Sequence, residues 1–94
     1  MHTIEDIKKL ISPIAEDYGV ERVYLFGSYA RGDATESSDV DIRIDSGNIK
    51  TLFKLGGFRS DLEEALKTQV DIADEGISEH FYNQIKVDEV VIYG

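Results

Sequence analysis

Two short motifs stand ten residues apart in this chain, and each borders a run that is typical of a β-strand. Gly27-Ser28 follows the apolar run 23–26, and Asp39-Val40-Asp41 opens the alternating run 39–45. Residues 33–38 between them are polar and lack periodicity, which predicts a loop. We therefore expect this loop to bring the end of one strand and the start of the next to the same edge of a sheet.

The second motif places two carboxylates on one face of a predicted strand. Asp39 and Asp41 point the same way, about 6.5–7 Å apart along the chain, because side chains alternate along a strand. Val40, Ile42 and Ile44 take the opposite face, so the pattern predicts a half-buried strand with one polar, open face. The two carboxylates raise each other's pKa unless a cation lies between them. Mg²⁺ prefers such oxygen ligands and can bridge them to a triphosphate.

Asp71 is the candidate for a third carboxylate. It lies in Val70-Asp71-Ile72, the same apolar–Asp–apolar setting that surrounds Asp41. If the two strands pair, Asp71 joins Asp39 and Asp41, and a second metal about 3.5–4 Å from the first would complete a two-metal site for in-line displacement. Such a carboxylate can help to deprotonate an attacking hydroxyl. Alternatively, Asp71 is a surface aspartate, and Asp45 or Asp74 takes this role.

The first motif is a candidate phosphate-binding turn. Gly27 leaves a strand and enters a helical turn, where a glycine lets a phosphate approach the backbone and free N–H groups attract anions. Ser28 adds a hydroxyl donor. Arg31, one turn further, either reaches a phosphate oxygen or forms a salt bridge over the loop.

Helical and strand-like segments alternate along the chain, which predicts a small α/β layer structure. A capping box at Thr3 and Asp6 begins a first helix, which Pro13 should kink or divide and Tyr18-Gly19 should end. The remaining expected elements are strands over 21–26, 39–45 and 69–73, a helical turn over 28–32, a helix over 49–67 weakened by its two central glycines, and a short helix after Ser78. Residues 90–93 form a last strand or an extended tail.

Composition narrows the class of protein. Ninety-four residues predict a single domain, 1–94. The chain has no cysteine, no secretion signal and no apolar run near 18 residues, so we expect a cytoplasmic protein without a membrane segment. The net charge of −9 argues against nucleic-acid binding by phosphate neutralisation. It leaves a solubilising surface, a face for a basic protein partner, or carboxylates clustered for divalent cations.

A resemblance now becomes specific. The run Gly27-Ser28-Tyr29-Ala30-Arg31-Gly32, followed by Ser38-Asp39-Val40-Asp41, resembles the signature of the polymerase β-like nucleotidyltransferase superfamily. It is most similar to the minimal nucleotidyltransferases (MNT), the antitoxin partners of HEPN-domain toxins in bacteria and archaea. Residues 20–26, 70–72 and 91–93 also fit that branch, so the resemblance covers most of the chain.

The resemblance implies a mixed β-sheet flanked by helices, ATP as donor and Mg²⁺, with two ions expected. It implies a type VII-like antitoxin that transfers AMP to a hydroxyl, a tyrosine, of a HEPN-type toxin. By carry-over, Gly27 and Ser28 hold the triphosphate, Asp39 and Asp41 bind metal, and Asp71 is the third carboxylate. Arg43 departs from the pattern of many relatives, and it could contact the nucleotide or pair with Asp41 or Asp45.

Two rival functions remain open. The chain could be a catalytically silent module that neutralises its partner by contact, in keeping with its acidic surface. It could instead modify a small molecule such as an aminoglycoside, although a chain this short has no second domain to close over a sugar. An acceptor would be held by the partner's own surface or by a second copy of this chain. Tyr29, beside the turn, belongs to the core or stacks on a base.

Overall fold

The computed structural model describes residues 2–45, 47–73 and 89–94. Asp74 and the helix predicted after Ser78 lie outside these ranges. In chain order the elements are α1 (Ile4–Tyr18), β1 (Arg22–Phe26), α2 (Gly27–Arg31), β2 (Val40–Asp45), α3 (Leu52–Leu66), β3 (Val70–Ala73) and β4 (Val90–Tyr93). None of the helices in the described ranges is long and apolar enough to cross a membrane.

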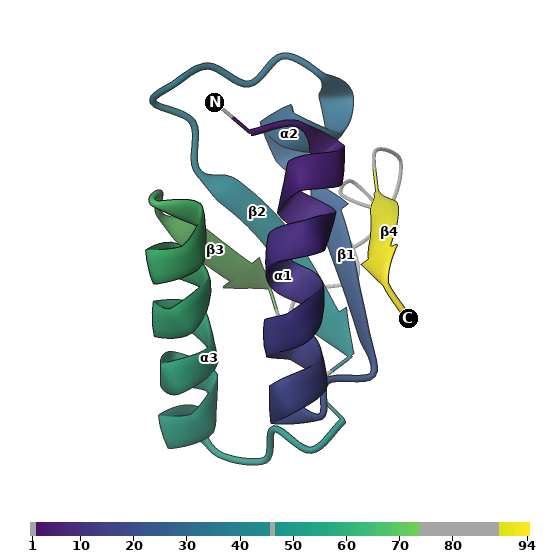
Figure 1. The fold of residues 1–94 in the computed structure, drawn as a ribbon, viewed down its shortest axis with the longest axis vertical. Helices are drawn as coiled ribbons and strands as arrows, with labels where there is room; N and C mark the ends of the chain where they lie inside the picture. The colour runs from purple at the N-terminus through teal and green to yellow at the C-terminus, as the bar shows by residue number, and fades with distance from the viewer. Residues whose placement is uncertain (1, 46, 74–88) are drawn as a thin grey trace.

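The four strands of the described residues form one mixed sheet, as expected, and their order is β3-β2-β1-β4. β1 pairs antiparallel with both β2 and β4, whereas β2 and β3 run parallel. A parallel pair needs a crossover connection, and α3 supplies it. Figure 1 shows α1 and α3 side by side over one face of this sheet.

The core lies between the sheet and these two helices. Alternation along β2 is as predicted, because Val40, Ile42 and Ile44 are all buried while Asp41 points to the other side. The two helices contribute apolar side chains at helical spacing to the same core: Ile7, Ile11 and Ala15 from α1, and Phe58, Leu62 and Leu66 from α3. The other sheet face carries Asp41, Arg43 and Asp45 of β2 beside Tyr24 and Phe26 of β1, and the candidate site lies there.

α1 begins and ends as predicted but is not divided. Thr3 and Asp6 form the capping box, and Gly19 ends the helix with a φ of 72°. Pro13 lies inside one continuous helix, which excludes the division of the helix, and the alternative of a kink stays a prediction. Pro13 is on the exposed side of the helix. The Lys9 carbonyl, which has no N–H donor at Pro13, can bind water there. Burial of the opposite side of the helix holds it together.

α3 begins later than the predicted residue 49, because Thr51 accepts a hydrogen bond from the Lys54 N–H (3.1 Å) and caps it. Its two central glycines lie in uninterrupted helix and have different surroundings. A Cβ atom added to Gly57 would lie 3.2 Å from the Tyr18 hydroxyl, whereas one added to Gly56 would meet nothing within 4 Å. Gly57 therefore lets α3 pack closely on α1, whereas Gly56 has no such packing role.

Candidate functional site

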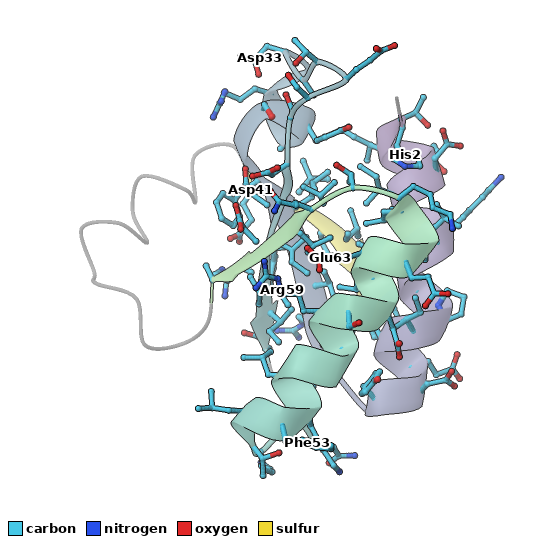
Figure 2. The ribbon with its side chains drawn as sticks, turned by 90° about the vertical axis from the view of Figure 1, so that its left-hand side faces the viewer. His2, Asp33, Asp41, Phe53, Arg59 and Glu63 are labelled. Carbon is cyan, nitrogen blue, oxygen red and sulfur yellow. The ribbon has the colours of Figure 1, made fainter. Side chains whose placement is uncertain are left out.

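The sheet register brings two of the predicted carboxylates together. Asp41 and Asp71 are direct partners in the parallel pairing of β2 with β3, so the predicted position of Asp71 is confirmed. Asp39 immediately precedes β2, at the same end of the strand. Figure 2 shows Asp41 on the side of the sheet away from α3. Two acidic residues on neighbouring strands and a third just before β2 are thus placed near the same end of these strands.

Gly27 joins the candidate phosphate-binding turn to these carboxylates. Its φ is 74°, a conformation that side chains disfavour, and an added Cβ would lie 2.4 Å from Asp41 Oδ2. α2 starts at Gly27, directly after β1, and Phe26 at the end of β1 pairs with Asp41. The predicted turn and the predicted metal-binding face are therefore in van der Waals contact, and only glycine allows this approach.

The loop between the motifs is held by its own polar side chains. The Thr35 N–H donates to Ser38 Oγ (2.8 Å), and the Ser38 N–H donates to the Thr35 carbonyl (3.0 Å). At its end, the Val40 N–H donates to the Gln69 carbonyl just before β3 (2.9 Å). We did not predict this role of Ser38, although Ser and Thr three residues apart in a polar loop are a known turn signal. These bonds fix Asp39 between the loop and β2.

The electrostatics of Asp41 reflect its position. Burial raises the pKa of Asp41 to about 6, and the negative charges of Asp71 and Asp39 act in the same direction. Arg31 opposes the rise in this pKa without cancelling it, and a hydrogen bond between the Asp41 and Asp71 carboxyls adds to it. The cluster is thus short of positive charge, which is the condition under which carboxylates bind a proton or a cation.

These residues suit a hard divalent cation. Asp39, Asp41 and Asp71 offer only oxygen donors, which Mg²⁺ prefers, and their mutual repulsion would be relieved by its charge. Within the described ranges no group of three or more histidine, cysteine, aspartate or glutamate side chains is placed to hold a metal ion by itself. This fits an ion that takes part of its coordination from water and phosphate oxygens, as Mg²⁺ does.

Arg31 is exposed and pairs across the turn. Its Nε lies 3.4 Å from Asp33 Oδ2, and both side chains are about half exposed or more. This is the predicted salt bridge over the loop, and it is weak enough to be exchanged for a phosphate. The phosphate contact itself stays a prediction.

Arg43 is buried rather than open to solvent. It forms a bidentate pair with Glu89 (2.7 and 2.8 Å), lies 3.4 Å from Asp45, and stacks 3.9 Å above the ring of Tyr24. The prediction of a polar, open face was therefore wrong at this position. Of the predicted partners, Asp45 is the one that pairs with it. Glu89 was missed because it is 46 residues away in sequence and carries no local signal.

Two further alternatives are decided by the structure. Asp45 accepts from the Tyr24 hydroxyl (3.2 Å) and pairs with two arginines, so it belongs to this ion-pair cluster and not to the carboxylate site. Tyr29 is 6% exposed and packs in the core, so it does not stack on a nucleotide base.

Comparison with known proteins decides the family. The model of the nucleotidyltransferase domain family matches residues 7–93, nearly the whole chain. The chain belongs to this family. Protein adenylyltransferase MntA of Thermococcus cleftensis is 38% identical over 76 residues, covering 77% of both chains. A Methanocaldococcus jannaschii protein described as a candidate protein adenylyltransferase is 44% identical over 69 residues, covering 73% of this chain and 74% of that one.

Solved structures place the chain within the family. A structure described as a candidate minimal nucleotidyltransferase has a TM-score of 0.80 at 28% identity and covers 95% of both chains. A Shewanella oneidensis complex of a tri-AMPylated HEPN toxin with an MNT antitoxin has a TM-score of 0.75 at 21% identity, covering 98% of this chain and 73% of that one, which shows a shared fold. The nucleotidyltransferase is thus of the minimal branch, and the predicted family, fold and enzyme class are confirmed.

Proposed function

We propose that this nucleotidyltransferase transfers AMP from ATP to a tyrosine hydroxyl of a partner HEPN-domain toxin and so acts as a type VII-like antitoxin. The observation that carries the proposal is the contact between the Gly27 turn and Asp41, whose direct strand partner is Asp71. A triphosphate on that turn would lie against oxygen ligands for its metal. The name of the Thermococcus cleftensis relative and the AMPylated toxin in the Shewanella oneidensis complex support protein as the acceptor.

Each site residue has a role in this reaction. The Gly27 turn, Ser28 and Arg31 would bind the triphosphate and orient the bond between its α- and β-phosphates. Asp39 and Asp41 would hold Mg²⁺, with Asp71 completing the set for a second ion. Bound Mg²⁺ neutralises phosphate charge and favours in-line displacement.

The bonds and the proton balance as follows. The acceptor oxygen forms a bond to the α-phosphorus while the bond from that phosphorus to the pyrophosphate oxygen breaks. Asp71, exposed at the sheet edge, accepts the hydroxyl proton and passes it to solvent. With a pKa of about 6 in the metal-free protein, Asp41 is mostly ionised at neutral pH and so is ready to bind a cation.

Label transfer tests the proposal. With Mg²⁺ and ATP labelled at the α-phosphate, the purified chain should label its HEPN partner, and a tyrosine-to-phenylalanine variant of the acceptor should not be labelled. Asp39→Ala should abolish labelling, whereas the matched loop variant Asp33→Ala should retain it. Robust labelling by Asp39→Ala would refute the assignment of the site.

A second candidate is neutralisation by contact alone. The net charge of −9 favours a basic partner surface, whatever the chemistry of the site. On this reading the Asp39→Ala/Asp41→Ala double variant still suppresses the toxin in cells. Loss of suppression by that variant, with the complex still forming, would exclude this candidate.

A further inference from the structure

A groove runs along the outer edge of the sheet, between α3 and β3. Its volume is about 340 Å³, and its lining residues are Leu52, Leu55, Gly56, Arg59, Asp71 and Ile72. Asp71 is also the direct strand partner of Asp41, so one end of the groove meets the carboxylate site. Figure 2 shows the order along α3, with Phe53 at the far end and Arg59 nearer to Asp41.

Gly56 is an unexplained residue in this groove. A glycine inside a helix costs about 0.5–1 kcal/mol relative to alanine. Neither a positive φ nor a close neighbour requires it, since an added Cβ would meet nothing within 4 Å. At its neighbour Gly57, by contrast, an added Cβ would lie 3.2 Å from the Tyr18 hydroxyl. A glycine without a packing role at the wall of a groove is the residue expected where another chain approaches the backbone.

The edge of β3 is closed at one residue by α3. The Val70 N–H donates to Glu63 Oε2 (3.1 Å), and the Val70 carbonyl accepts from Arg59 Nε (2.9 Å). Backbone groups two residues apart in a strand point to the same edge, so those of Ile72 point outward as well. Ile72 lines the groove, so an extended chain lying there could form main-chain hydrogen bonds with it.

The outer end of the groove is apolar and exposed. Leu52 is 85% exposed and Phe53 is 90% exposed, although both are large apolar side chains. Exposed apolar residues of this size beside a groove are typical of a protein-binding surface. The charged side chains that line the groove are one arginine, Arg59, and one aspartate, Asp71, so the lining has no excess of either sign.

We infer that this groove holds an extended segment of the acceptor polypeptide, with an apolar side chain against Leu52 and Leu55 and the accepting hydroxyl directed to Asp71. The inference rests on the proposed function, because it assigns the groove to the acceptor of that reaction. It makes Gly56 a specificity-determining residue that leaves room for the acceptor backbone.

Filling the groove tests this assignment. Gly56→Leu should lower kcat/KM for the HEPN acceptor at least tenfold while leaving the KM for ATP unchanged. The matched control is Gly57→Ala, which also removes a helical glycine but faces α1, and it should leave both parameters unchanged. Unaltered acceptor kinetics in Gly56→Leu would overturn the inference, and so would a raised KM for ATP, which would assign the groove to the nucleotide.

A second measurement does not depend on turnover. The chain has no cysteine, so Gly56→Cys and Glu64→Cys each introduce a single thiol, in the groove and on an exposed part of α3 respectively. Saturating HEPN acceptor should slow alkylation at position 56 at least tenfold and leave position 64 unaffected. If the acceptor slowed alkylation equally at positions 56 and 64, the inference would be overturned. Protection at position 56 without AMP transfer would support the groove and refute the proposed reaction.

Discussion

Two groups of charged side chains lie on the same face of β2 only two residues apart, and they are built in opposite ways. Around Arg43, the cation is matched by Glu89 and Asp45 and covered by Tyr24. Around Asp41, the charges of Asp39 and Asp71 act with burial to raise the pKa of Asp41 to about 6, and exposed Arg31 is the cation among the described residues that opposes this rise. The first group is electrostatically complete, and the second lacks positive charge.

This difference in charge balance indicates that the group around Arg43 stabilises the fold and the group around Asp41 serves the function. A balanced, hydrogen-bonded ion pair contributes to holding strands together, and nothing further needs to bind to it. A half-buried carboxylate beside two others destabilises the free protein, so its presence calls for another explanation. In this chain the adjacent Gly27 turn supplies the explanation. A phosphate bound on the turn and a cation bound by the carboxylates would balance the charge of the group.

The largest expected effect comes from neutralising one aspartate in each group. Asp41→Asn should reduce AMP transfer about a thousandfold or more, because a ligand of the metal is lost. Asp45→Asn, on the same strand and face, should leave transfer within about twofold. Initial rates with labelled ATP measure both. Equal losses in the two variants would show that the groups do not differ in function.

Gly27→Ala should have the second-largest effect. The added Cβ would lie 2.4 Å from Asp41 Oδ2 at a φ of 74°, so the turn or the carboxylate must move. We expect a loss of about 1–3 kcal/mol in the free energy of unfolding and about a hundredfold in transfer. Gly32→Ala is the control, since its φ is also positive (85°) but an added Cβ meets nothing within 4 Å. It should lose stability and keep most activity.

Breaking the balanced group should cost stability but little activity. Glu89→Gln removes the bidentate partner of Arg43, whose side chain is only 10% exposed, and Asp45 compensates in part. We expect about 2–3 kcal/mol less stability in urea unfolding. Asp33→Asn removes the partner of exposed Arg31 and should change the free energy by less than about 0.5 kcal/mol. Similar losses of stability in Glu89→Gln and Asp33→Asn would contradict this difference between the buried and the exposed ion pair.

The smallest expected effect is a pH dependence of the metal-free protein. The pKa of Asp41 is raised in the folded state, so its stabilising contribution is complete below about pH 4 and is lost as pH rises through about 6. Since Asp41 is only half buried, screening reduces this contribution to on the order of 1 kcal/mol. Wild type should therefore lose stability relative to Asp41→Asn from pH 4 to pH 7, so the difference between their free energies of unfolding should grow. A constant difference would refute it.

Much of the site could be predicted from the sequence, because its information is local. The spacing of the two motifs, the alternation along β2 and the similar settings of Asp41 and Asp71 are all short-range patterns, and the strand register followed them. What could not be predicted depended on tertiary packing. The pairing of Arg43 with Glu89 joins distant segments, and the continuity of α1 through Pro13 depends on burial of its inner side.

The central claim is that the carboxylates around Asp41 bind a divalent cation together with a nucleotide. It is tested most directly by calorimetric titration of Mg²⁺ into the protein at pH 7.5 with a non-hydrolysable ATP analogue. Wild type and Asp45→Asn should bind Mg²⁺ with similar affinity, and Asp41→Asn should bind at least tenfold more weakly. Undiminished binding by Asp41→Asn would contradict the account.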